Sequence, residues 1–204
     1  MNADQPTILV PAQIGAPFEG GFYGGQIRSG AKTFAIAWAP KAQGETKAAW
    51  LPKRKLVPGA TSCYHSMDNT RAMAEAGSKL AKWALGLDIA GHSDWCIPAR
   101  DVLEFAYRHL KPGTQDNYAG FRDGDNPSSI PPGYPYTEQA PAQTSVAAFQ
   151  KGGAEAFDPV WYWSSTQYSE GSAWNQTFGY GSQLSTSKSA EAQARAVRLI
   201  QLNP

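Results

Sequence analysis

The four residues Asp123-Gly124-Asp125-Asn126 carry side-chain oxygens of the kind that bind Ca²⁺ in proteins. They match only the start of an EF-hand loop, because no Glu follows at the position that completes the ligand set. The calcium-binding triplets of animal lectins, Glu-Pro-Asn and Gln-Pro-Asp, do not occur in the chain. We therefore expect a capped surface turn here and no metal ion or other cofactor.

The histidines and serines lack the spacing that catalysis needs. His65, His92 and His109 show no ligand spacing such as His-x-x-x-His, and isolated histidines are more often structural. No Gly-x-Ser-x-Gly motif frames a nucleophilic serine. The sequence therefore predicts a protein that is not an enzyme.

A stretch in the last third of the chain, Trp161–Ser187, has a composition suited to recognition. Its 27 residues include seven Ser, three Thr, three Tyr and three Trp, and Glu170 is its only charged residue. Acid–base catalysis needs two acidic groups in one pocket, which this stretch does not offer. Buried strands would leave its many hydroxyls and amides in need of hydrogen-bond partners. Antibody contact loops use the same mixture, in which Tyr and Trp give rigid contact area and Ser, Gly and Asn give adaptable hydrogen bonds.

Alternation divides part of this stretch into two faces, because every second side chain of a strand points the same way. In Ala173–Gly179, the large side chains of Trp174, Gln176 and Phe178 are expected on the scaffold side. The small residues Asn175, Thr177 and Gly179 are expected on the exposed side. The segment that follows, Gly179–Ser187, is turn-like and is expected to present its side chains outward.

Hydrophobic periodicity predicts the elements that position this stretch. Strands are expected at Thr7–Val10, Thr33–Ala39, Trp161–Thr166, Ala173–Phe178 and Arg195–Leu202. One helix is expected from a cap at Asp68 or Asn69 to Leu85, with Gly86 as its stop. A second has Pro98 in its first turn, ends at Pro112-Gly113, and carries a core stripe of Leu103, Ala106, Tyr107 and Leu110. A long loop, Thr114–Thr144, is rich in Pro, Gly, Asp and Ser.

Four motifs together resemble a C-type-lectin-fold family that includes phage tail-fibre and receptor-binding proteins and variable proteins diversified by retroelements. They are Asp94-Trp95-Cys96-Ile97-Pro98-Ala99-Arg100-Asp101-Val102-Leu103, Trp161-Tyr162-Trp163-Ser164-Ser165-Thr166-Gln167, Ala173-Trp174-Asn175-Gln176-Thr177-Phe178 and Arg195-Ala196-Val197-Arg198. Their order and spacing are similar from about Gly30 to Leu202. The resemblance implies an α+β, C-type-lectin-like fold with two helices, a mixed or antiparallel sheet, long loops, and first and last strands paired.

In the retroelement-diversified members, mutagenesis changes chosen positions between anchor residues. The resemblance implies scaffold anchors at Trp163, Trp174, Gln176, Phe178, Gly181 and Gln183. It implies ligand-binding positions at Glu170, Gly171, Ser172, Asn175, Thr177, Gly179, Tyr180, Ser182, Leu184, Ser185, Thr186 and Ser187, to which Tyr168 adds an aromatic contact. Glu170 departs from the pattern, since adenine mutagenesis of an AAY codon does not yield Glu.

Composition bounds the partners and the location. With 204 residues, 42% of them hydrophobic and 12% aromatic, the chain can bury a core. A formal net charge of +1 without a basic run argues against nucleic acid as a partner. Met1–Pro11 lacks the features of a signal peptide, and no apolar segment is long enough to cross a bilayer. We expect synthesis in the bacterial cytoplasm, no membrane insertion and assembly into a phage virion.

The domain prediction is a loosely structured, Gly/Pro-rich segment over residues 1–30, used for attachment or subunit contacts, followed by a ligand-binding domain over residues 31–204. Expected partners are a bacterial surface protein or glycan and other tail proteins, with a homotrimer as one expected assembly. The alternative is a structural tail or particle decoration protein. A formylglycine-generating-like enzyme is a third hypothesis. It needs a reactive cysteine pair near the C-terminal end, whereas Cys63 and Cys96 lie upstream and are interpreted as small apolar groups.

Overall fold

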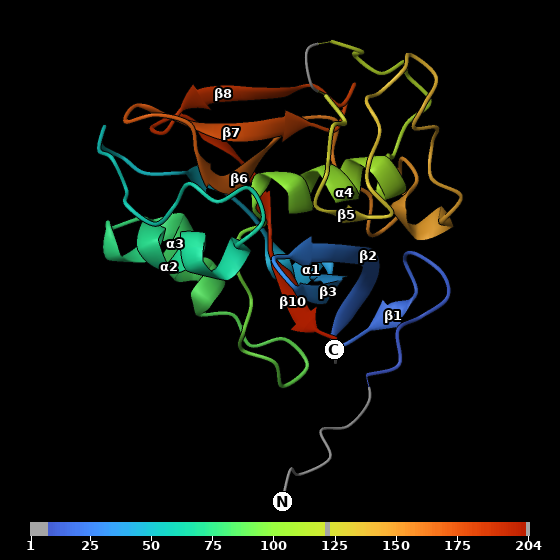
Figure 1. The fold of residues 1–204 in the computed structure, drawn as a ribbon, viewed down its shortest axis with the longest axis horizontal. Helices are drawn as coiled ribbons and strands as arrows, with labels where there is room; N and C mark the ends of the chain where they lie inside the picture. Colours follow the sequence, from blue (N-terminus) through green and yellow to red (C-terminus); the bar gives the residue numbers. More distant parts are fainter. Residues whose placement is uncertain (1–7, 121–122, 203–204) are drawn as a thin grey trace, which may run out of the picture.

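The computed structural model of the protein describes residues 8–120 and 123–202. Within these residues, two five-stranded sheets and four α-helices form an α+β fold (Figure 1). None of these helices is long and apolar enough to span a bilayer. The expected combination of α and β elements is confirmed, although the described residues contain four helices where two were predicted.

The first sheet has the strand order β1-β2-β3-β10, and β5 pairs with β2. Its strands are all antiparallel: β1 (Pro17–Phe18), β2 (Gly21–Ser29), β3 (Lys32–Trp38), β5 (Ser129–Ile130) and β10 (Val197–Gln201). The predicted strand at Thr33–Ala39 is therefore confirmed. The last strand, β10, pairs with β3, so the first and last strands predicted within residues 31–204 are paired as expected, although β1 and β2 precede them in the chain.

The N-terminal part of the chain is more ordered than predicted. Gly21–Ser29 forms a full strand, so the expectation of a loosely structured lead-in is wrong there. The glycines of this segment were interpreted as turn residues, but Gly25 lies within β2 at a register shift. Its φ is +114°, and a Cβ on it would lie 2.3 Å from the Phe105 ring. The predicted strand at Thr7–Val10 is not formed over residues 8–10, and Thr7 lies outside the described residues.

The second sheet has the order β4-β9-β6-β7-β8. Its pairs are antiparallel except the β6–β9 pair, and its strands are β4 (Glu45–Ala49), β6 (Trp161–Gln167), β7 (Ser172–Thr177), β8 (Gln183–Ser187) and β9 (Glu191–Arg195). The predictions for β6 and β7 are confirmed. The turn-like interpretation of Gly179–Ser187 is confirmed for Gly179 and Tyr180 but wrong for Gln183–Ser187, where pairing with β7 forms strand β8. The predicted closing strand is divided at Ala196, where the chain passes from β9 to β10.

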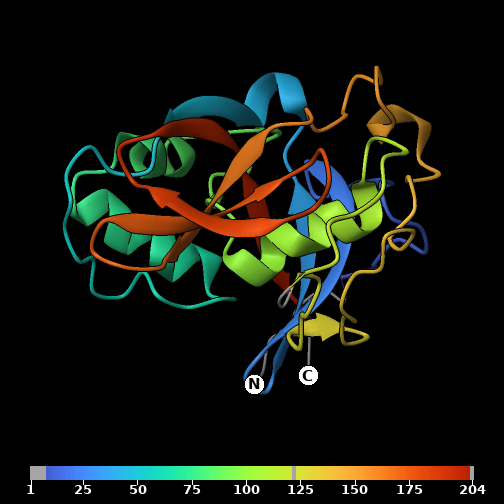
Figure 2. The same cartoon turned by 90° about the horizontal axis from the view of Figure 1, so that it is seen from above.

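Helix α4 (Arg100–Leu110) lies between the two sheets and contacts β2, β6 and β7 (Figure 1). Its predicted stripe is buried, and the chain leaves the helix at Lys111 before Pro112, as expected. Pro98 precedes the helix instead of occupying its first turn. Seen from above, β7 and β8 cross over α4 (Figure 2).

The other predicted helix is divided into α2 (Ser66–Glu75) and α3 (Lys79–Leu85). The division falls at Gly77, whose φ of +100° is disfavoured for residues with a side chain. Ser78 then caps α3, and Gly86 ends it as predicted. The cap predicted at Asp68 or Asn69 is wrong, since both lie inside α2. The remaining short helices are α1 (Lys41–Gly44) and the 3₁₀ turn η1 (Ala147–Phe149).

Candidate ligand-binding surface

The predicted ligand-binding residues lie at three depths in the structure. Those exposed to solvent are Tyr168, Glu170, Tyr180, Leu184, Ser185 and Ser187. Those half-buried are Gly171, Ser172, Gly179 and Thr186. Those buried are Asn175, Thr177 and Ser182. The prediction of an exposed surface thus fits only part of the set.

The expected exposure of Asn175 and Thr177 is wrong, because large side chains lie beside them. Across β6 and β7, Trp163 pairs with Asn175 and Trp161 pairs with Thr177. Directly paired residues of antiparallel strands point to the same face with their Cβ atoms about 5 Å apart, so each tryptophan lies beside the smaller side chain. Asn175 and Thr177 are therefore buried within the sheet, and the Asn175 Nδ2 donates to the Thr186 Oγ1 at 2.8 Å.

The predicted scaffold residues Trp163, Gln176 and Phe178 lie in the interior. Trp174 is half-buried: its ring meets the Tyr168 ring edge-on at 5.1 Å between centroids, and the Arg100 guanidinium lies 5.0 Å from its centroid. Tyr168 therefore projects from a supported position on the side of the sheet that carries Trp174.

Three aromatic residues lie near one another along the backbone at the other end of β7, and we call Tyr118, Trp161 and Tyr180 the aromatic patch. Tyr180 and Tyr118 are 44% and 55% exposed, and the Tyr118 N–H donates to the Tyr180 carbonyl at 2.7 Å. The Trp161 and Tyr180 rings meet edge-on at 6.4 Å. No pattern in the sequence singles out Tyr118, because it lies in the long loop and only the fold brings its backbone beside Tyr180.

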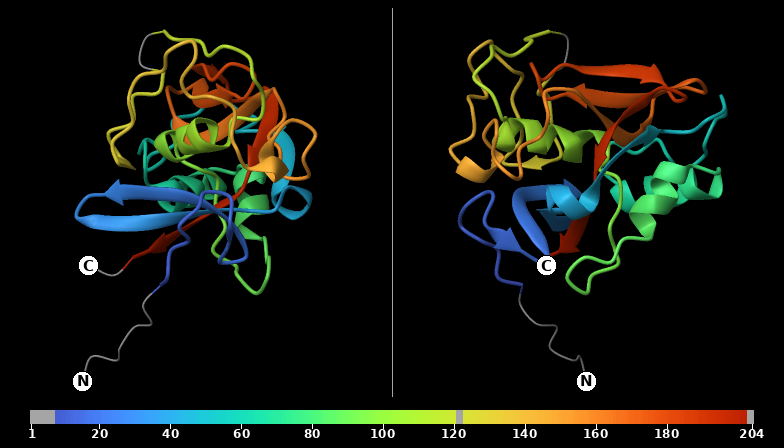
Figure 3. Two further views of the ribbon diagram at one scale, coloured as in Figure 1. Left: turned by 90° about the vertical axis from the view of Figure 1, so that its right-hand side faces the viewer. Right: turned by 180° about the vertical axis from the view of Figure 1, so that it is seen from behind.

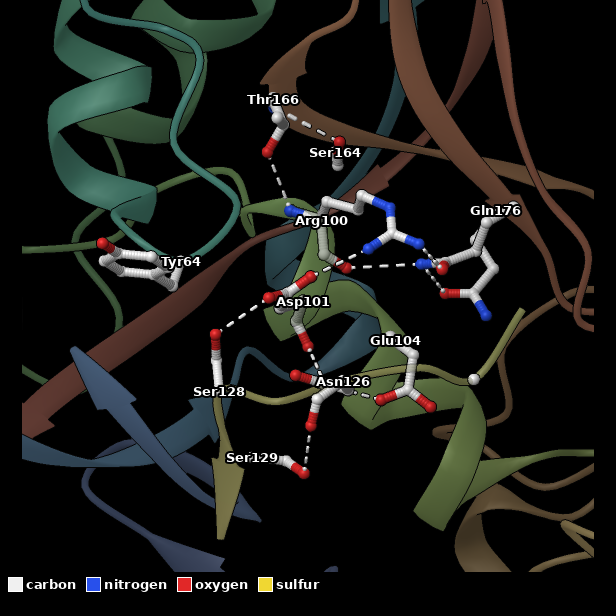
Figure 4. Close-up of polar contacts among 12 residues, drawn as sticks. Tyr64, Arg100, Asp101, Glu104, Asn126, Ser128, Ser129, Ser164, Thr166 and Gln176 are labelled. Carbon is white, nitrogen blue, oxygen red and sulfur yellow. Dashed lines mark hydrogen bonds and ion pairs between the residues drawn. The ribbon is translucent and has the colours of Figure 1, made fainter. Parts of the chain in front are cut away.

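The first residue of β8 is anchored to α4 and to the long loop. The Arg100 Nη2 donates to the Gln183 Oε1 at 2.5 Å, and the Gln183 N–H donates to the Asp123 Oδ1 at 2.8 Å. The Arg100 Nη1 donates to the Asp101 Oδ1 at 3.0 Å, and the Arg100 backbone N–H donates to the Thr166 Oγ1 at 2.9 Å (Figure 4). Because Arg100, Gln183 and Asp123 are all buried, these contacts fix where β8 begins.

A second buried cluster fastens the long loop to α4 around Glu104. The Tyr136 hydroxyl donates to the Glu104 Oε1 at 2.7 Å. The Asn126 Nδ2 donates to the Glu104 Oε2 at 2.6 Å (Figure 4). Arg108 lies 2.9 Å from the same carboxylate, and Gln176 of β7 donates to the Tyr136 hydroxyl at 3.2 Å. Burial raises the pKa of Glu104, and Arg108 opposes that shift. Loop, helix and β7 are thus joined into one rigid support.

The residues considered as a calcium loop take part in these clusters. The interpretation as a capped surface turn is wrong for Asp123 and Asn126, which are buried with their side chains turned inward. Over residues 8–120 and 123–202, no group of three or more His, Cys, Asp or Glu side chains could hold a metal ion. The Asp123 and Asn126 side chains thus make hydrogen bonds in the interior, whereas Asp125 is exposed.

No disulfide joins the two cysteines. Cys96 is buried and its thiol donates to the Val197 carbonyl at 3.3 Å, whereas Cys63 is half-buried. Burial raises the pKa of Cys96, so its thiol stays protonated at neutral pH and is a poor nucleophile.

The three histidines lie apart from the predicted surface. His65 lies 3.8 Å from Asp68 and His92 lies 3.8 Å from Glu19. His109 packs against Phe105, and burial lowers its pKa to about 4, which keeps the imidazole neutral at pH 7.

Comparison of the chain with family models, with curated proteins and with solved structures finds no match in any of the three.

Proposed function

We propose that the protein is a ligand-binding module of C-type-lectin-like architecture that contacts a bacterial surface protein or glycan without catalysing a reaction. The supporting observation is the aromatic patch, in which two exposed tyrosines are joined through their backbones beside a half-buried tryptophan. Tyrosine and tryptophan combine apolar contact area with a polar group, and exposed clusters of them are typical of recognition surfaces.

Preorganisation supports the same proposal. The clusters around Arg100 and Glu104 hold β7, β8 and the long loop in one arrangement, so a ligand need not order them on binding. Loop and side-chain ordering is one of the main costs of association, and a surface that is already rigid avoids part of it.

In this proposal the exposed residues contact the ligand, and the buried ones support them. The contact residues are Tyr118, Tyr168, Glu170, Tyr180, Leu184, Ser185 and Ser187, with Trp161 beside them. We further propose that the module is carried at a phage tail-fibre tip or by a retroelement-diversified variable protein, where several copies on one particle raise weak single-site affinity through avidity.

The test uses Tyr180→Ala and Tyr118→Ala, measured by binding of the purified protein to intact bacterial cells and to arrays of bacterial surface polysaccharides. Each variant should weaken binding about tenfold or more, the size expected of an aromatic anchor. Tyr134→Ala is the matched control, since Tyr134 is also an exposed tyrosine of the long loop but its ring lies against Arg108.

Two outcomes would refute the proposal. One is the absence of binding to every cell type and polysaccharide. The other is binding that both variants retain in full. Alanine variants that leave host adsorption unchanged, together with a failure of particle assembly when the protein is absent, would favour the structural alternative.

A further inference from the structure

Three consecutive basic residues, Lys53, Arg54 and Lys55, lie on a loop that follows β4, and we call them the basic patch. All three are exposed, as is the next residue, Leu56. None of the three forms an ion pair with a carboxylate of residues 8–120 or 123–202. The loop therefore presents three positive charges to solvent.

This loop lies against the connection between β6 and β7, residues 168–171, at one corner of the molecule (Figures 1 and 3). The Lys55 N–H donates to the Glu170 carbonyl at 3.1 Å. A Cβ on Gly171 would lie 3.1 Å from the Arg54 Nε, so the guanidinium lies against the backbone of the connection. The basic patch thus borders the predicted ligand-binding stretch, which precedes β8 by only a few residues at this point.

Buried groups beneath the loop fix its shape. The Lys188 ammonium donates to the Lys55 carbonyl at 2.8 Å, and the Val57 N–H donates to the Gln167 Oε1 at 2.8 Å. At the start of the loop, the Leu51 N–H donates to the Lys188 carbonyl at 3.0 Å. Because Lys188 and Gln167 are buried, the backbone of the basic patch is held in place before any ligand arrives, which lowers the cost of ordering it on binding.

The surroundings of the basic patch combine positive charge with hydroxyl groups. Glu170 is the only charged residue of Trp161–Ser187, so three positive charges adjoin one negative charge here. The other exposed side chains of the connection are those of Tyr168, which is 60% exposed, and Ser169. A positive field favours acidic ligands, and a tyrosine offers an apolar ring with a polar tip. This combination suits a ligand that carries both acidic groups and sugar rings.

We propose that the basic patch binds the acidic groups of an anionic bacterial polysaccharide and that Tyr168 contacts its sugar rings. The inference rests on the proposed function and specifies the chemical class of its ligand. Nucleic acid fits less well, because proteins that bind it commonly make about six to ten phosphate contacts, whereas the basic patch has three basic side chains.

The test is isothermal titration calorimetry of the full chain with polygalacturonate, in which every sugar carries a carboxylate, and with neutral dextran. The wild type should bind polygalacturonate and not dextran. Its affinity should fall about tenfold or more from about 50 to about 200 mM NaCl, because binding releases counterions from the polyanion. The triple variant Lys53→Gln, Arg54→Gln, Lys55→Gln should bind about tenfold or more weakly at the lower salt concentration and lose most of this salt dependence.

The matched control is the triple variant Arg28→Gln, Lys32→Gln, Lys151→Gln. It also removes two lysines and one arginine, all from exposed positions outside the second sheet. It changes the net charge by the same amount and should bind polygalacturonate like the wild type. Tyr168→Ala, which leaves the basic patch intact, should weaken binding about fivefold, the loss expected of an aromatic contact.

Three results would overturn the inference: no binding of polygalacturonate, an equal loss in the two triple variants, or tighter binding of duplex DNA than of polygalacturonate. The cell-binding assay separates this inference from the proposed function. Cell binding that is lost in Tyr118→Ala and Tyr180→Ala but unchanged in the basic-patch variant would overturn the inference and leave the proposed function intact. An absence of binding to every cell type and polysaccharide would overturn both.

Discussion

Replacing Lys188 with methionine should remove a pH-dependent part of the protein's stability. Lys188 is fully buried, and its ammonium donates to the Lys55 carbonyl at 2.8 Å and to the Gln167 Oε1 at 2.6 Å. The Trp50 ring centroid lies 4.7 Å from the same nitrogen. Burial lowers the pKa of Lys188 to about 8, against a smaller opposing effect of Glu170.

The sign follows from proton binding in the two states. Between pH about 8 and the ordinary lysine value of 10.5, the unfolded chain keeps the proton that the folded protein has released. The free energy of unfolding therefore rises with pH across this window, by up to about 1.4 kcal/mol per pH unit for one proton. From pH 8 to pH 10, the wild type should gain about 2 kcal/mol relative to Lys188→Met.

The assay is urea unfolding at several pH values from 7 to 10, followed by tryptophan fluorescence, with the variant's free energy subtracted from that of the wild type. Subtraction cancels the other titrating groups, which both proteins share. Lys47→Met, at an exposed position of β4, controls for the loss of one lysine from the chain. Equal pH dependence in the wild type and Lys188→Met would refute the reasoning.

Three further predictions concern buried groups. Tyr136→Phe should lower the free energy of unfolding by about 1–3 kcal/mol in urea titrations, since the Glu104 carboxylate loses a buried hydrogen-bond donor; an unchanged midpoint would contradict this. The Cys96 thiol should resist a thiol reagent until the protein unfolds, as mapped by mass spectrometry, because burial raises its pKa; modification of the folded protein would argue against that burial. Gly25→Ala should lower the melting temperature by several degrees, because the new Cβ would lie 2.3 Å from the Phe105 ring at a φ of +114°; an unchanged melting temperature would show that the site is less constrained.

Local patterns were sufficient where the residue types of a segment favour one kind of element. The helical stripe of α4 and the β-forming residues of β3, β6 and β7 predicted elements that the fold contains, and these elements are largely buried. Local patterns failed where glycine and serine, which are typical of turns, lie within strands. Glycine in β2 permits close packing against α4, and serine in β8 lies on an edge strand, so neither segment looks like a strand on composition alone.

The candidate surface was predicted only in outline. Tyr168, Tyr180 and Leu184 are exposed as composition suggested, but Asn175 and Thr177 are buried opposite tryptophans of the neighbouring strand. The prediction that Asn175 and Thr177 are exposed used alternation within one strand. Alternation does not show which side chains the neighbouring strand places on the same face, because this depends on the pairing register of two segments.

By itself the sequence determined an α+β chain with a polar, aromatic-rich last third, since composition and periodicity are local properties. Only the tertiary structure decided which of those side chains reach solvent, that Tyr118 joins Tyr180, and that Asp123 and Asn126 turn inward to hold β8 and α4. These outcomes depend on contacts between residues far apart along the chain. Such contacts form where burial and hydrogen bonding between distant segments outweigh the local preference of polar residues for water.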